Sequence, residues 1–221
     1  MDGVSLTLGG ARLLALPSGA LLWPARRLLV VADLHLGRSE RYARRAGALL
    51  PPYEVEDTLG RLEAVLAATD PAMVVCLGDS FDDAEAARLP GDLAQWLRRL
   101  TAGRRWIWIE GNHDPGPVAP LGAHLAELTL DGLAFRHIAR PEAQAEISAH
   151  YHPRLRIAGT ARRCFLADGR RIILPAFGTY TGGLAADDPA LARLMQPGAR
   201  AVLTGPVARL VPMPRSRRQD A

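Results

Sequence analysis

The sequence predicts an α/β fold in which a parallel sheet with helical crossovers is followed by a more antiparallel half. Three continuous apolar runs, at residues 28–32, 73–77 and 106–110, are typical of strands buried on both faces. Segments with apolar residues at helical spacing separate these runs, which indicates strand–helix–strand units. After residue 125 the pattern changes, because Asp131-Gly132 and Asp168-Gly169 each lie between apolar or alternating runs and predict hairpins.

The first half can be followed element by element. Residues 1–25 read as short antiparallel strands with turns at Gly9-Gly10 and at Pro17-Ser18-Gly19. A helix is predicted over about 53–68, where Asp70-Pro71 ends the apolar periodicity. A second helix is predicted from four apolar residues at helical spacing: Leu93, Trp96, Leu97 and Leu100.

The second half is expected to consist mainly of strands. These are predicted at residues 125–138, 145–149, 155–160, 163–176 and 200–211. No repeat or low-complexity linker divides the chain, so we expect one domain over residues 1–211. Residues 212–221 lack apolar content and are expected to form a loose basic tail.

Composition excludes several classes of protein. Of 221 residues, 48% are hydrophobic and 23% are charged, which argues against a disordered or fibrous chain. All 27 basic residues are Arg and the net charge is +4, a weak indication of a nucleic-acid partner. Cys76 and Cys164 read as buried core residues, which form neither a disulfide framework nor a metal motif. With no stretch of ~18 apolar residues and no leader-like start, the bacterial cytoplasm is the expected location.

Polar residues follow each predicted parallel strand. The three motifs are Asp33-x-His35, Gly78-Asp79 and Gly111-Asn112-His113-Asp114. Because functional groups gather beyond the carboxyl ends of such strands, we expect these loops to lie side by side.

Three further histidines extend this set. His137 follows the predicted strand that ends at Arg136, and His150-x-His152 would point two imidazoles to one face of a regular strand. Each motif alone is common in unrelated proteins, but their joint occurrence at strand ends predicts a metal site.

The ligand types indicate which metals would bind. Carboxylate, imidazole and Asn carbonyl oxygen suit manganese, iron or zinc. Seven candidate ligands exceed what one four-coordinate ion needs, whereas two ions about 3.5–4 Å apart would use them all. Such a pair generates hydroxide at neutral pH and stabilises in-line displacement at phosphorus.

In this order and spacing, the motifs resemble those of the calcineurin-like metallophosphoesterase superfamily. The resemblance implies a four-layer sandwich, two mixed β-sheets flanked by helices, with a dinuclear metal site. It implies that one ion is held by Asp33, His35, Asp79 and His152. It implies that the second ion is held by Asp79, Asn112, His137 and His150, with Asp79 bridging.

The resemblance also assigns roles beside the metals. His113 would face the scissile phosphate, where it stabilises charge or protonates the leaving oxygen, and Asp114 would orient His113. Ala149 departs from the family pattern, which has Gly before the first histidine of His-x-His. No motif flanks His137, so His124 is the alternative ligand at that place.

A narrower resemblance comes from three stretches of sequence, at residues 33–38, 147–153 and 177–184. They are similar to the bacterial ligase-associated DNA-damage-response endonucleases, whose partners are a DNA ligase, a helicase and a second nuclease. The resemblance implies a manganese-dependent DNA endonuclease acting in DNA repair on single strands, by attack of a hydroxide bridging two metal ions.

Some residues beside the motifs could contact DNA. Arg38 and Arg44, together with Arg41 and Arg45, follow the first metal loop and could contact phosphates, although a solvated helix face is the alternative. Tyr180 lies in a Gly-rich stretch, where it could stack on a base or brace a loop.

Two other functions remain open at this stage. One is a phosphatase or small phosphodiesterase for nucleotides or cyclic nucleotides, which needs a closed pocket in place of an open basic groove. The other is a non-catalytic binding scaffold of the same fold, which should lack ligands or the His of the Asn-His-Asp motif.

Overall fold

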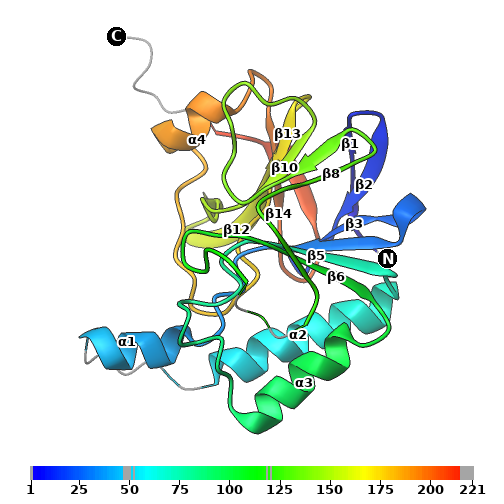
Figure 1. The fold of residues 1–221 in the computed structure, drawn as a ribbon. Helices are drawn as coiled ribbons and strands as arrows, with labels where there is room; N and C mark the ends of the chain where they lie inside the picture. Colours follow the sequence, from blue (N-terminus) through cyan, green and yellow to red (C-terminus); the bar gives the residue numbers. More distant parts are fainter. Residues whose placement is uncertain (1, 47–50, 52, 118, 120, 215–221) are drawn as a thin grey trace.

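The computed structural model describes residues 2–46, 51, 53–117, 119 and 121–214, with the side chains of residues 44–46 left out. Two β-sheets form the centre of the molecule (Figure 1). The N-terminal sheet has the spatial order β1-β2-β3-β4-β5-β6-β7. Its strands are β1 (Val4–Leu8), β2 (Ala11–Ala15), β3 (Leu21–Trp23), β4 (Leu28–Val31), β5 (Met73–Leu77), β6 (Arg105–Ile109) and β7 (Ala123–Leu125).

The first four strands of this sheet are antiparallel, and β4, β5 and β6 run parallel, as the sequence predicts. β7, which the sequence does not predict, continues the parallel order. Residues of β4 alternate between two apolar environments. Leu28 and Val30 face the C-terminal sheet, whereas Leu29 and Val31 face the helices. The continuous apolar run therefore reflects burial on both faces, and it aligns the carboxyl ends of β4, β5 and β6.

Helices cover the outer face of the N-terminal sheet. They are α2 (Glu54–Thr69) and α3 (Gly91–Thr101), which lie side by side along the sheet (Figure 1). The predicted helix over about 53–68 is thereby confirmed, and Asp70 ends it in a left-handed conformation. A single 3₁₀ turn, η1 (Pro24–Arg26), precedes β4, and α1 (Arg38–Ala46) projects from the body beside the N-terminal end of α2 (Figure 1).

The C-terminal sheet has the order β15-β14-β12-β13-β10-β9-β8, and β11 pairs with β12. Its strands are β8 (Leu128–Leu130), β9 (Leu133–Phe135), β10 (Glu146–Ser148), β11 (Arg154–Ile157), β12 (Thr160–Ala167), β13 (Arg171–Ile173), β14 (Arg200–Leu203) and β15 (Arg209–Pro212). Both Asp-Gly hairpins are confirmed, and Asp131 and Gly132 adopt positive φ in the tight turn between β8 and β9.

The expected strand limits in this half are wrong in several places. Residues 125–138 contain the end of β7, which belongs to the other sheet, and then a hairpin. Residues 163–176 contain the β12–β13 hairpin, and β10 pairs in parallel with both of its neighbours, so the half is mixed. Each of these two ranges includes an Asp-Gly turn, so each spans two short strands with the turn between them.

Three apolar cores separate four layers. One lies between α2 and α3 and the N-terminal sheet, and the second lies between the two sheets. The third lies between the C-terminal sheet and α4 (Pro189–Leu194), where Leu191 packs on Cys164 and Leu166. The expected four-layer sandwich is therefore confirmed.

Smaller expectations can also be checked. Cys76 and Cys164 are free and buried, as expected. The sequence predicts a loose tail from Pro212, and this start is too early. Pro212 pairs with Arg200 in β15, and the Met213 amide donates to the Ala199 carbonyl. Residues 215–221 lie outside the described residues. Within the described part of the chain, no helix has the length and apolar content needed to cross a membrane.

Candidate metal centre

The loops after β4, β5 and β6 lie side by side, as predicted. The His35 amide donates to the Asp79 carbonyl at 2.9 Å, which joins the first two loops. The Asp114 carboxylate joins the second and third loops. It accepts four backbone N–H groups, from Asp79, Ser80, Phe81 and Gly111, at 2.7–3.2 Å.

The His150-x-His152 pair corrects one expectation. β10 ends at Ser148, so the two histidines lie in the turn that follows the strand and not on a regular strand. Five candidate ligands have a positive φ that is uncommon for residues other than Gly: Asp33 (51°), His35 (46°), Asp79 (46°), His150 (71°) and His152 (47°). Unusual backbone of this kind persists where the surrounding contacts fix it, and it gathers at functional sites.

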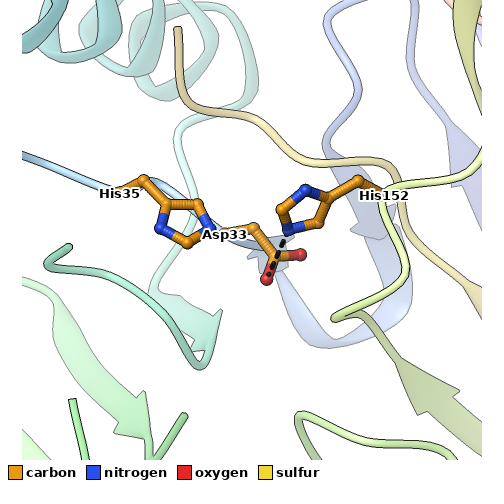
Figure 2. Close-up of side chains that lie close together, drawn as sticks. All are labelled: Asp33, His35 and His152. Atoms are coloured by element: carbon orange, nitrogen blue, oxygen red, sulfur yellow. Dashed lines mark ion pairs between the residues drawn. The ribbon is translucent and has the colours of Figure 1, made fainter. Parts of the chain in front are cut away.

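Asp33, His35 and His152 form the first ligand set (Figure 2). Asp33 Oδ1 lies 3.2 Å from His152 Nε2. The His35 Nδ1–H donates to Asp82 Oδ1 at 2.7 Å, which leaves Nε2 free to bind an ion. Asp33 Oδ1, His35 Nε2 and His152 Nε2 are buried without a hydrogen-bond partner. Buried unpaired polar atoms are costly, and a shared cation would satisfy all three.

Asp79, His137 and His150 form the second set. The His137 Nδ1–H donates to the Leu77 carbonyl at 2.9 Å, so Nε2 faces the other ligands. That atom lies 3.0 Å from Asn112 Oδ1, 3.2 Å from His150 Nδ1 and 3.4 Å from Asp79 Oδ2. The four groups therefore converge on one point.

Asp79 stands between the two sets. Its Oδ2 lies 3.4 Å from His137 Nε2 and 3.9 Å from His35 Nε2. Its Oδ1 accepts the His113 amide at 2.9 Å, which fixes the carboxylate. One oxygen of Asp79 thus reaches both sets, as a bridging ligand must.

The electrostatics of the second set favour a cation. Burial opposes charging of His137, but its hydrogen bond with Asp79 and the charge of Asp33 raise its pKa to about 9. Burial likewise opposes ionisation of Asp79, but His137 and the His113 amide lower the pKa of that carboxyl. The same acidic surroundings that raise the pKa of His137 would favour a divalent metal ion, so the residues fit one.

The expected role of Asp114 needs correction. Both of its oxygens accept backbone amides, so it organises the loops and does not itself bind the His113 imidazole. His113 is oriented by the Asp82 carbonyl, which accepts from Nδ1 at 2.9 Å. The imidazole lies edge-on to the ring of His35, with 5.0 Å between centroids.

Asp82 and Arg41 have contacts that the sequence patterns did not assign. The Asp82 carboxylate is fully buried and accepts from His35 Nδ1, from Arg38 at 3.2 Å and from Arg41 at 2.9 Å. Arg41 also lies 3.4 Å from His113 Nδ1. Arg38 is therefore beside the site, as expected, whereas the side chain of Arg44 lies outside the described residues.

The structure also shows where His124, the alternative to His137, and Ala149, the departure from the family pattern, lie. His124 lies on β7, where it stacks on Trp108 and contacts the Ala119 carbonyl, away from both sets. His137 is therefore the histidine that the fold brings to the other ligands. Ala149 is fully buried between the sheets without a positive φ, so the missing Gly does not distort the turn.

The glycine-rich segment, residues 177–184, packs against the backbone of the loops that carry Asp33 and His152. The Gly178 amide donates to the Asp33 carbonyl at 3.1 Å, and the Leu184 amide donates to the Tyr151 carbonyl at 3.1 Å. A Cβ at Gly178 would lie 1.9 Å from the Leu34 oxygen, and a Cβ at Gly183 would lie 1.9 Å from the His152 oxygen. The backbone approaches both metal loops so closely that only Gly fits.

Comparison with known protein families agrees with this geometry. Residues 26–195 match the family described as calcineurin-like phosphoesterase. The chain belongs to this family and is a phosphoester hydrolase.

Among solved structures, the chain is similar to the crystal structure of Pseudomonas putida nuclease MPE. The two are 30% identical with a TM-score of 0.75, over 96% of this chain and 100% of that one. A search of curated proteins found no match.

Proposed function

We propose that the protein is a metal-dependent DNA endonuclease that cuts phosphodiester bonds in single strands. One observation carries the hydrolytic part of the proposal: two ligand sets converge on the single carboxylate oxygen Asp79 Oδ2. The choice of DNA is supported by the similarity to a nuclease over almost the whole of both chains. Two arginines beside the site, Arg38 and Arg41, also suit a phosphate backbone.

The ligands divide as the family resemblance implies. One ion would be held by Asp33, His35, His152 and Asp79. The other would be held by Asp79, Asn112, His137 and His150. Divalent ions bound there would supply an activated water and positive charge for the phosphate oxygens. Carboxylate, imidazole and amide ligands without thiolate suit manganese, and iron or zinc are the alternatives.

The residues around the ligands prepare the site for phosphoryl chemistry. His113 has Nδ1 fixed on the Asp82 carbonyl, so its Nε2 is the atom available to the phosphate or the leaving oxygen. Asp114 holds the amides of Asp79 and Gly111 and thereby fixes the loop that carries His113. We propose that His113 stabilises charge on the substrate or protonates the leaving oxygen, with Asp114 as a positioning residue.

The cellular setting follows from the narrower resemblance. We propose a role in DNA repair in the bacterial cytoplasm, in functional association with a DNA ligase, a helicase and a second nuclease. Residues 1–211 would act as one catalytic domain. The described arginine side chains of α1 beside the site, Arg38 and Arg41, would border the strand.

The test is a comparison of substrates with purified protein and Mn²⁺. The substrates are single-stranded DNA circles, duplex circles and a nitrophenyl phosphodiester, and circles are used because they lack ends. We expect the single-stranded circles to be linearised and then fragmented, and the duplex circles to be cut far more slowly. Asp79→Ala should abolish the activity, whereas the matched control His124→Gln should retain it.

Two other outcomes of this comparison would favour the alternative functions. Hydrolysis of the nitrophenyl ester or of cyclic nucleotides without cutting of DNA would favour the small phosphodiesterase. Metal binding without turnover of any phosphoester would favour a binding scaffold and contradict the proposal.

A further inference from the structure

The glycine-rich segment, residues 177–184, carries an aromatic side chain between its two backbone contacts with the metal loops. Gly178 abuts the loop of Asp33 and His35, and Gly183 abuts His152. Tyr180 lies between these two contacts, within about 7 Å of chain from Gly178 at 3.3–3.6 Å per residue. Its position is therefore set by the same backbone contacts that support the ligands.

Tyr180 is held in an uncommon backbone conformation. Its φ is 58°, a value that bulky residues rarely adopt. The neighbours fix it: Thr179 bonds to Thr58 and Arg61, and Arg163 donates to the carbonyls of Phe177 and Gly178. Because these polar contacts hold the segment, the ring of Tyr180 is not needed to fill a core.

A second tyrosine stands beside Tyr180. Tyr53, the residue before α2, has 58% of its surface exposed. The two ring centroids are 6.4 Å apart, and the planes are inclined by 54°. Hydrogen bonding with Tyr53 raises the pKa of Tyr180 to about 12, so the Tyr180 hydroxyl stays protonated at neutral pH. An exposed ring and a half-buried ring thus lie side by side.

Charged side chains of both signs lie near the pair, and the Arg61 guanidinium pairs with Asp57 at 3.0 Å. The Arg61 guanidinium lies 4.9 Å from the centroid of Phe177 and donates to Thr179, next to Tyr180 in the chain. Arg163 is half-buried, and burial together with the charge of Arg61 lowers its pKa to about 10, which leaves it charged at neutral pH. Aromatic faces beside cations are the combination with which proteins bind single-stranded nucleic acids.

We propose that Tyr53 and Tyr180 form a stacking subsite for one unpaired base of the strand whose phosphodiester occupies the metal centre. The proposal rests on the proposed nuclease function and deepens it by naming residues that select single strands. A base in a duplex is stacked on its neighbours and paired, so it cannot lie on an external ring without being extruded. An unpaired base can do so with no such cost.

The test is an abasic scan with the wild-type enzyme. A series of single-stranded oligonucleotides carries one abasic site, moved stepwise away from the cleaved bond. Removal of the base at one position should lower kcat/KM roughly 5- to 100-fold, the range that one base–aromatic stack contributes. Equal cleavage of the whole series would overturn the proposal without requiring any variant.

Two pairs of variants then assign the effect. Tyr180→Leu and Tyr53→Leu should cut the complete oligonucleotide more slowly by the same factor and should lose their sensitivity to that abasic site. Tyr180→Phe and Tyr53→Phe keep the rings and should behave as wild type. Leu variants that melt normally and remain fully sensitive to the abasic site would show that the tyrosines only brace the segment.

The two proposals fail in different ways. If the enzyme hydrolyses the nitrophenyl ester but cuts no oligonucleotide, the proposed nuclease function is wrong. If it cuts every oligonucleotide equally well, the nuclease function stands and the stacking subsite is wrong.

Discussion

The N-terminal sheet presents Asp33, Asp79 and Asn112 directly after the carboxyl ends of three adjacent parallel strands. The C-terminal sheet supplies His137, His150 and His152 from turns after the short strands β9 and β10. In the first region strand alignment brings the ligands together. In the second region, His150 and His152 follow the end of β10 in a turn and do not lie on paired strands, although left-handed backbone occurs at ligands of both regions.

Different contacts keep the two halves of the site rigid. Regular hydrogen bonds between neighbouring strands fix the first half. The second half depends on distant partners, since the His150 amide donates to Asp33 and the glycine-rich segment packs on His152. We therefore expect substitutions that loosen each half to act through different contacts, and substitutions of shared groups to have the largest effects.

Asp79 is the group that both halves share. Asp79→Ala should abolish metal-dependent hydrolysis more completely than the loss of any other single ligand, because Oδ2 lies between the two sets. Mn²⁺ should raise the Tm of the wild type, since binding to the folded state stabilises it, and this shift should be lost in the variant.

Metal titration by calorimetry provides the decisive measurement for this variant. Two ions still bound tightly by Asp79→Ala would contradict the bridging role. The control is Asp92→Ala, which removes an exposed carboxylate from α3 and should leave metal binding unchanged.

His113 belongs to the N-terminal half and is not one of the proposed metal ligands. His113→Ala should bind Mn²⁺ as the wild type does and lose on the order of 10²–10⁴ in turnover on DNA. The loss should be smaller on the nitrophenyl diester, because nitrophenolate leaves without a proton. Equal losses on both substrates would assign His113 to charge stabilisation or to structure.

The two halves also differ in how far the sequence predicts them. Apolar runs identify β4, β5 and β6, so the loops of Asp33, Asp79 and Asn112 follow from strand order alone. The sequence predicts a strand at His150 and His152, because side chains two residues apart on a strand point to the same face. The spacing does not reveal that both residues have positive φ.

Contacts between distant segments were beyond the sequence as well. His35 and Asp82 are 47 positions apart, and nothing in either loop indicates that one orients the other. The same holds for Tyr53 and Tyr180, which lie in different elements and meet only in the folded chain.

Asp82→Asn tests the rigidity of the N-terminal half. The amide would present its oxygen or its NH₂ group to His35 Nδ1 and the two arginines, but without the negative charge. Loss of such a partner behind a metal-binding histidine lowers metal affinity or activity by about 10–100-fold. Measurement of the Mn²⁺ concentration for half-maximal activity should show this increase. An unchanged value would mean that the strand ends alone orient His35.

Gly183→Ala tests the C-terminal half. A Cβ there would lie 1.9 Å from the His152 oxygen, at a φ of 153° that L side chains rarely adopt. Overpacking of this kind costs about 1–3 kcal/mol in the free energy of unfolding, and His152 should shift, so Mn²⁺ affinity falls less than tenfold. Gly182→Ala is the matched control, because a Cβ at Gly182 meets nothing within 4 Å. Equal urea midpoints for the two variants would show that the segment moves to accommodate the added Cβ without loss of stability.

The smallest effect on the chemistry is expected at the edge of the N-terminal half, where Arg38 and Arg41 border the site. A variant with both replaced by Gln should bind single-stranded DNA more weakly, and its nitrophenyl diesterase rate should fall less than its DNA cleavage, because a small ester presents no neighbouring phosphates. Each phosphate contact contributes about −0.7 to the slope of log affinity against log salt, so loss of two contacts should flatten the slope by roughly 1.4. Arg26 and Arg27 are the matched control, since they are exposed, pair with Asp131 and Asp70, and carry the same charge. If the slope of log affinity against log salt does not change and both substrates are affected alike, α1 is a solvated basic face. That result would favour the small phosphodiesterase.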